Sequence, residues 1–160
     1  MNSENYKVDQ IDPFVYEFNS NGNRGNIPII VVFTPMSDST FNLGFGVWKA
    51  DTNYADDLTE TRNGDADKIL GTVAQIALDF LENRPLAKIY ATGSCARRTR
   101  KYQMGINKNL SFLNEKYIIR GLVTDRTKRT TFNPSYPNWR DNWQDVRSGV
   151  NYDAFLLYLK

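Results

Sequence analysis

The chain has 160 residues, an ordinary apolar content, a net charge of +2, one cysteine and no histidine. Without histidine and with a lone cysteine, a structural zinc site, an internal disulfide and histidine-activated serine or cysteine nucleophiles are excluded. No apolar run approaches the ~18 residues that cross a membrane, so we expect no membrane partner. The length predicts a single domain over residues 1–160, and the lone cysteine favours a cytoplasmic location. We expect neither a metal ion nor a cofactor.

The first half of the chain predicts three strands. Residues 14–18 and 27–34 are apolar runs on either side of residues 19–26, which are rich in the turn formers Asn, Gly and Ser. They predict a hairpin whose loop is longer than the tight two-residue type. Residues 41–49 alternate apolar with small or polar side chains and predict a third strand.

Two helices and a strand are predicted next. Asp65 is the expected N-cap of a helix that ends before Pro85, because the apolar residues behind it recur at helical spacing. Residues 86–92 predict a fourth strand, and residues 95–114 a second helix. The expected apolar face of that second helix consists of Cys95, Tyr102, Ile106, Leu110 and Leu113.

Two strands close the predicted fold. Residues 117–123 form the fifth strand, and residues 124–150 are expected to be a long polar loop. Residues 152–159 form the sixth strand. One face of that strand is expected to carry Tyr152, Ala154, Leu156 and Tyr158. The order βββαβαββ predicts an α+β fold with a mainly antiparallel sheet and two helices on one face.

The junction between the fourth strand and the second helix is the leading candidate for a binding site. A strand that ends at Gly93-Ser94 and leads into a helix leaves backbone N–H groups that suit an oxyanion. Cations in the first turns oppose the helix dipole unless an anion is present. The predicted ligand-binding residues are Gly93, Ser94, Arg97, Arg98, Arg100, Lys101 and Tyr102.

The helical wheel assigns two roles to these cations. Arg98 lies near Cys95 and Tyr102, so we expect it to be buried against a carboxylate or backbone carbonyls. Arg97, Arg100 and Lys101 lean away, and they either contact an anion or form a solvated helix face. Cys95 is expected to be a buried structural cysteine rather than a reactive one.

The charges are strongly segregated along the chain. Residues 1–83 hold 5 Lys/Arg and 13 Asp/Glu, whereas residues 84–130 hold 12 Lys/Arg and two acids. Either the two halves pair internally, or an exposed basic face attracts a polyanion.

Two further segments carry candidate residues. An acidic loop could hold a hard cation, but it has no calcium-loop spacing and reads better as a turn into an N-cap. Its acids are Asp51, Asp56, Asp57, Glu60, Asp65 and Asp67. A loop of interleaved aromatics and arginines could stack bases or cover a sheet edge. Its residues are Phe132, Tyr136, Trp139 and Trp143 with Arg129, Arg140 and Arg147.

Several short sequence motifs of the chain resemble those of a family of small bacterial domains of unknown function. They include Asn63-Gly64-Asp65 and the run Gly93-Ser94 followed by Arg98-Thr99-Arg100 and Tyr102-Gln103-Met104. Residues 127–150 depart from the family pattern. The resemblance implies a whole-chain domain of bacterial type and implies no activity.

Three functions remain open on the sequence. The first is a module without catalysis that binds nucleic acid or a phosphate ligand through the basic element. The second is a metal-independent ribonuclease of the small toxin type, in which Arg98, Arg100, Lys101 and Tyr102 supply the groups. The third is a protein-interaction module that binds a basic partner or a second copy. No catalytic residue is assigned.

Overall fold

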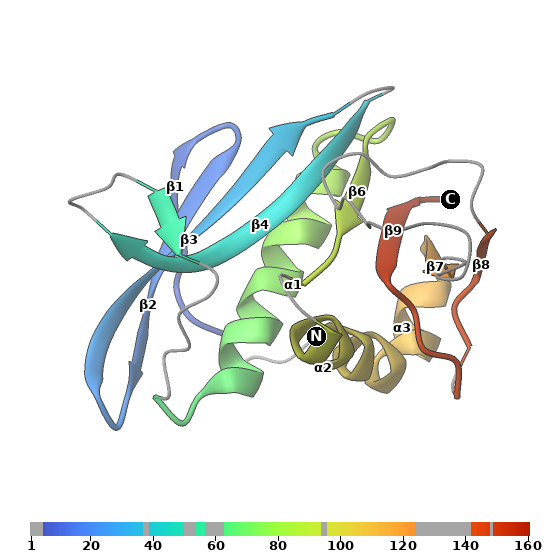
Figure 1. The fold of residues 1–160 in the computed structure, drawn as a ribbon. Coiled ribbons are helices and arrows are strands. Elements are labelled where there is room, and N and C mark those ends of the chain that lie inside the picture. The colour runs from blue at the N-terminus through green and yellow to red at the C-terminus, as the bar shows by residue number, and fades with distance from the viewer. Residues whose placement is uncertain are drawn as a thin grey trace. The chain divides into compact units, whose positions relative to one another are not determined.

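The computed structural model describes residues 5–36, 39–49, 54–56, 63–93, 96–123, 142–147 and 149–160. The fold is α+β with a mainly antiparallel sheet, which confirms the predicted class (Figure 1). Contacts divide the chain into two compact units: unit 1 comprises residues 1–34 and 43–80, and unit 2 comprises residues 35–42 and 81–160. The expectation of a single domain stays a prediction.

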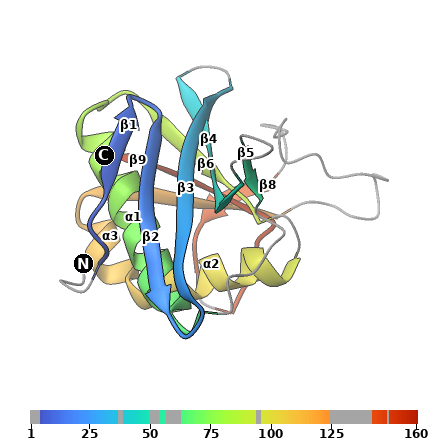
Figure 2. The ribbon, with the colours of Figure 1, turned by 90° about the vertical axis from the view of Figure 1, so that its left-hand side faces the viewer.

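Unit 1 consists of one helix and neighbouring strands, of which β1, β2 and β3 lie side by side in Figure 2. Strand β4 follows β3 in the hydrogen-bonded order, and β5 pairs with β4. The elements are β1 (Asp9–Asp12), β2 (Val15–Gly22), β3 (Gly25–Pro35), β4 (Thr40–Lys49), β5 (Tyr54–Asp56) and α1 (Ala66–Glu82). Strands β3 and β4 and the end of helix α1 extend across the boundary between the units.

Helix α1 packs on the strands through the face that its periodicity predicts. Ile69, Val73 and Ile76 are buried, and the ring of Phe80 stacks on Phe33 of β3 with centroids 3.9 Å apart. The helix begins directly after Asp65, whose backbone carbonyl accepts the Ile69 N–H at 3.0 Å, while the described bonds of its carboxylate go to Tyr6 and Ser20. Apolar burial on one stripe of the helix therefore accounts for this contact.

The hairpin of β2 and β3 differs from the prediction. Gly22 pairs with Gly25, so the loop contains two residues and not the longer stretch expected from composition. Asn63 accounts for the difference. Its side-chain oxygen accepts the Arg24 N–H at 2.5 Å, and its side-chain amide donates to the Gly25 carbonyl at 2.9 Å. A side chain from a distant segment of the sequence therefore supplies the hydrogen-bond partners of the backbone groups in this tight turn.

Unit 2 contains a sheet and two consecutive helices. Its strand order begins with Thr40–Asn42 of β4, which pair in parallel with β6, and continues antiparallel through β9, β7 and β8. The elements are β6 (Lys88–Ala91), α2 (Ala96–Lys108), α3 (Leu110–Asn114), β7 (Tyr117–Val123), β8 (Asn142–Asp145) and β9 (Ala154–Leu159).

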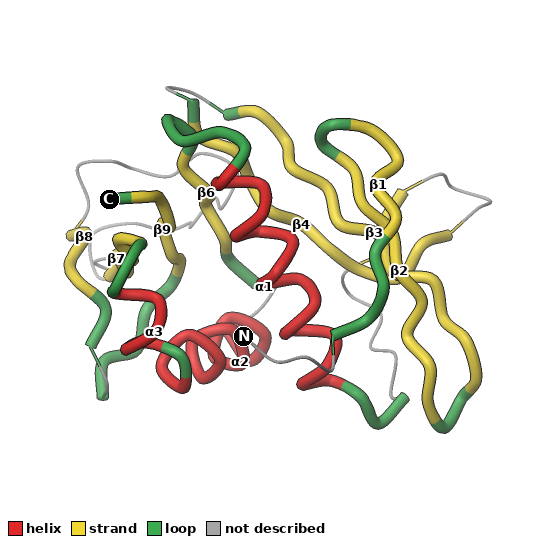
Figure 3. The backbone as a smooth tube through the Cα atoms, turned by 180° about the vertical axis from the view of Figure 1, so that it is seen from behind, coloured by secondary structure: helices red, strands yellow, loops and turns green. Residues whose placement is uncertain are grey.

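The second predicted helix is interrupted at Asn109. This residue has φ −110° and ψ 15°, and its N–H bonds to the carbonyl of Ile106. Its side-chain amide donates to the Gly105 carbonyl at 2.9 Å. The side chain thus competes with the regular helical ladder, and α2 ends before α3 begins, as Figure 3 shows.

Two predictions for the end of the chain were wrong. Strand β8 lies inside the predicted loop 124–150, where Trp143 packs against the buried cluster of Tyr90, Leu122, Ala154 and Leu156. Strand β9 begins at Ala154. Tyr152 is not on the face of Ala154, because its ring packs instead against Gly121 and Phe155.

Candidate anion-binding site

The turn between β6 and α2 is closed by a side chain of the helix. The N–H of Gly93 donates to the hydroxyl oxygen of Thr99 at 2.9 Å, and Thr99 is buried. Just before it, the Thr92 hydroxyl donates to the Asp153 carbonyl at 2.7 Å. The Gly93 amide, which the sequence suggested for an anion, is therefore already engaged within the protein.

The buried side of α2 is polar. Among the α2 side chains that the structure describes, Thr99 and Gln103 are the buried ones, one turn apart on the helix. The Gln103 side-chain amide donates to the Val150 carbonyl, and its oxygen accepts the Tyr152 N–H at 3.2 Å. The predicted apolar face of this helix is thus only half-buried at Tyr102 and Ile106, and a glutamine amide supplies the main anchor.

The opposite side of α2 carries exposed cations. Arg100, Lys101 and Lys108 are exposed, and Met104 between them is 64% exposed. The helix contains no acidic residue. Ser94 and Cys95 lie outside the described residues, and so do the side chains of Arg97 and Arg98, so the expected burial of Arg98 stays a prediction.

The ion pairs of unit 2 lie elsewhere. Within the described part of this unit, Lys116 pairs with Glu82 at 2.5 Å and Arg120 pairs with Asp145 at 3.2 Å. Neither pair uses a cation of α2. The exposed charges of the helix are consequently available to an external partner as far as the described side chains extend.

The division into two units coincides with the segregation of charge. Unit 2 contains 15 Lys/Arg and 7 Asp/Glu, a net charge of +8, whereas unit 1 contains 5 Lys/Arg and 11 Asp/Glu, a net charge of −6. Folding therefore collects the basic residues into one compact unit. A field of this sign attracts polyanions and raises their rate of encounter.

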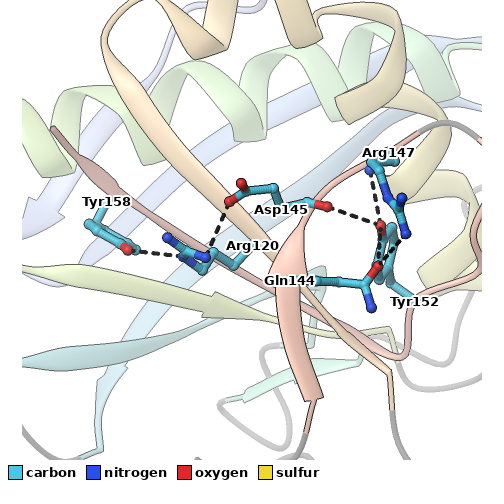
Figure 4. A network of polar contacts seen from close by, with 6 residues as sticks. All are labelled: Arg120, Gln144, Asp145, Arg147, Tyr152 and Tyr158. Atoms are coloured by element: carbon cyan, nitrogen blue, oxygen red, sulfur yellow. Dashed lines mark hydrogen bonds and ion pairs between the residues drawn. The ribbon is translucent and has the colours of Figure 1, made fainter.

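Tyr152, whose N–H donates to Gln103 of α2, also bonds through its hydroxyl to residues of β8 and to Arg147, and Figure 4 shows this hydroxyl network. The Tyr152 hydroxyl accepts the Arg147 N–H at 3.0 Å and donates to the Asp145 carbonyl at 3.3 Å. The Arg147 guanidinium donates to the Gln144 side-chain oxygen at 3.2 Å. The sequence alone did not predict this network, because its hydrogen bonds join segments that only the fold brings together.

Among the acidic candidates that the structure describes, Asp65 has a structural role. One oxygen of Asp65 accepts the hydroxyls of Tyr6 and Ser20, both at 2.5 Å. Asp67 is exposed. Asp51, Asp57 and Glu60 lie outside the described residues, as does the Asp56 side chain. No group of His, Cys, Asp or Glu in the described ranges is arranged to hold a metal ion.

The aromatic loop is described only at its end. Trp143 belongs to β8, and Arg147 bonds to Gln144 as above. The remaining candidates, Phe132, Tyr136, Trp139, Arg129 and Arg140, lie outside the described residues. Among the helices that the structure describes, none has the length and apolarity needed to cross a membrane.

Comparison of the amino-acid sequence with family models places the whole chain in one family. The chain belongs to a family of unknown function, DUF6934, whose model matches residues 2–160. This match confirms the expected whole-chain relationship to a family of unknown function. No match to the chain was found among curated proteins or among solved structures.

Proposed function

We propose that this protein is a nucleic-acid-binding module whose contact surface is the exposed side of α2. One observation carries the proposal: Arg100 and Lys101 are exposed on an acid-free helix whose other side is anchored by Thr99 and Gln103. A helix held in this way presents its cations without having to reorganise, which lowers the entropic cost of binding.

The geometry favours an extended polyanion over a single small phosphate at this element. A small phosphate would need the free amides of the strand-to-helix turn, and Gly93 already donates its N–H to Thr99. The cations instead follow the helix from its start to Lys108. Repeated phosphates of a strand match a row of cations, and the net charge of +8 on unit 2 adds a long-range attraction.

The test is fluorescence anisotropy with a labelled 20-nucleotide RNA and its DNA equivalent (a length of about two helical turns), titrated at about 50 mM and 200 mM salt. The wild-type protein should bind at the lower salt and lose affinity steeply at the higher. Replacing Arg97, Arg100 and Lys101 together with alanine should abolish most binding. The salt slope should fall by about one unit for each lost phosphate contact.

A control variant replaces three exposed lysines outside α2, namely Lys7, Lys68 and Lys160, and so removes the same charge. Both triple variants should keep the wild-type melting temperature, because exposed charges contribute under about 0.5 kcal/mol each. If both variants lose the same affinity, the loss reflects net charge alone, and α2 is not the contact surface. Absence of wild-type binding at low salt would refute the function altogether.

The ribonuclease hypothesis is tested with the same labelled RNA. If the wild-type protein cleaves this RNA and the Tyr102→Phe variant does not, the protein is a ribonuclease rather than a binding module.

The protein-interaction hypothesis predicts instead salt-sensitive self-association in light scattering. A cytoplasmic location and a bacterial origin remain expectations that accompany the proposal.

A further inference from the structure

A second group of cations lies on the sheet of unit 2, separate from the side chains of α2. Lys88 of β6 pairs in register with Tyr158 of β9, so that both side chains lie on one face. Arg120 of β7 pairs with Leu156, two residues from Tyr158, and shares that face. Three strands thus place two cations and one phenol together.

The contacts within this group are specific. The Lys88 ammonium lies over the Tyr158 ring, 5.0 Å from its centroid. The Arg120 Nε–H donates to the Tyr158 hydroxyl oxygen at 3.3 Å, as Figure 4 shows. This hydrogen bond is the main cause that raises the pKa of Arg120 above its ordinary value.

Donor capacity in the group exceeds the described acceptors. Arg120 has five N–H donors, of which the described contacts use those on Nε and Nη1. The Tyr158 oxygen accepts from Arg120, so its own O–H proton remains available. For Lys88, the described side chains supply an aromatic ring and no carboxylate within ion-pair distance. Ammonium, guanidinium and hydroxyl donors therefore lie around one tyrosine, Tyr158.

A carboxylate already occupies part of this place. Asp145 of the short strand β8 contacts Arg120 Nη1 at 3.2 Å, and its side chain is 78% exposed. Such an exposed ion pair contributes little net free energy, so an incoming anion can displace it at small cost. The Asp145 carboxylate also shows that an anionic oxygen fits against this face of the guanidinium.

We propose that Lys88, Arg120 and Tyr158 form a binding site for a phosphate group, with Asp145 as its internal competitor. Arg120 offers the planar donors that match phosphate oxygens, Lys88 adds a point charge, and the Tyr158 hydroxyl donates a third bond. The phosphate belongs either to a small phosphoester or to a nucleic-acid strand. The site does not depend on the α2 surface.

The experiment compares inorganic phosphate, AMP and a 12-nucleotide RNA (roughly the length that one binding groove covers) as probes, by calorimetry for the first two and anisotropy for the third. Arg120→Gln should weaken binding by about tenfold or more, the loss expected for one charge-assisted contact. Lys116→Gln is the matched control, because it removes one exposed charge from the same unit and should leave the affinity unchanged.

Asp145→Asn provides a gain-of-binding test that does not depend on how well Arg120→Gln folds. Removing the competing carboxylate should strengthen phosphate binding several-fold, whereas a purely structural ion pair would leave affinity unchanged and lower stability slightly. Binding of phosphate and AMP identifies a small phosphoester, and binding of RNA alone identifies a strand. If neither Arg120→Gln nor Asp145→Asn changes the affinity for any of the three probes, the proposal is wrong. The α2 triple variant should behave as wild type toward phosphate and AMP.

Discussion

The ring of Tyr152 lies so close to Gly121 that a Cβ atom on residue 121 would stand 2.2 Å from Tyr152 Cδ1. Gly121 sits in β7, paired with Gln144 of β8 on one side and Phe155 of β9 on the other. Because Gly121 has no side chain, the Tyr152 ring can lie directly against β7. Its hydroxyl then reaches the position where it accepts the Arg147 N–H. One glycine thus admits the central residue of the network in Figure 4.

Gly121→Ala should therefore lower the free energy of unfolding by about 1–3 kcal/mol, the usual cost of forcing atoms into a packed site. Urea unfolding followed by circular dichroism measures it. Gly105→Ala is the matched control, because the added Cβ on α2 meets nothing within 4 Å and should raise stability by up to about 1 kcal/mol. Similar effects of the two substitutions would contradict the close approach at Tyr152.

Asn63→Ala should destabilise unit 1 by about 1–3 kcal/mol, since it removes the bonds to the turn amide of Arg24 and the carbonyl of Gly25 and the buried bond to the Ser20 hydroxyl. Asn63 is only 2% exposed, so water cannot easily replace its side chain. Hydrogen exchange at the Arg24 amide should accelerate with it. The exposed Asn114 is the control: if Asn114→Ala costs as much, Asn63 has no special role in the hairpin.

Tyr90→Phe should raise stability by about 1 kcal/mol. Tyr90 is fully buried, its hydroxyl has no hydrogen-bond partner among the residues that the structure describes, and burial raises the pKa of this phenol well above its ordinary value. Removing an unsatisfied hydroxyl removes a desolvation cost. Tyr117→Phe is the contrasting variant, because that hydroxyl bonds to Glu82 at 2.9 Å and its loss should destabilise. A destabilised Tyr90→Phe protein would mean that the hydroxyl is satisfied in solution.

Stability should depend on acid pH through Glu82. Hydrogen bonds from Lys116 and then from Tyr117 lower the pKa of this carboxyl below its usual value of 4.5. The folded state therefore favours the ionised form. The resulting contribution is present above pH 4.5 and is lost as the pH falls through the lower, folded-state pKa.

Urea midpoints measured between about pH 3 and pH 7 should thus fall less steeply for Glu82→Gln than for the wild type. The difference should shrink in a Lys116→Gln background, where the main hydrogen bond to the carboxylate is absent and only the one from Tyr117 remains. Parallel pH profiles of wild type and Glu82→Gln would contradict the shift.

The sequence alone predicted the elements whose pattern is local. The strand at residues 117–123 has the predicted bounds, and α1 follows the predicted helix because its apolar stripe repeats every turn. Strand β1 escaped prediction because all four of its residues are exposed and only Ile11 among them is apolar, so it has no alternation to detect. Strand β8 is a four-residue strand on an edge, defined by its pairing with β7 rather than by its composition.

The same distinction applies to the candidate site. The sequence predicted a basic helix after Gly93, and its exposed cations Arg100 and Lys101 follow from helical spacing. Only the tertiary structure decided that Thr99 takes the Gly93 amide and that Gln103 holds the backbone near Tyr152. Exposure and periodicity are properties of neighbouring residues, whereas the partner of a buried polar group comes from a segment far along the chain, and only folding brings the two together.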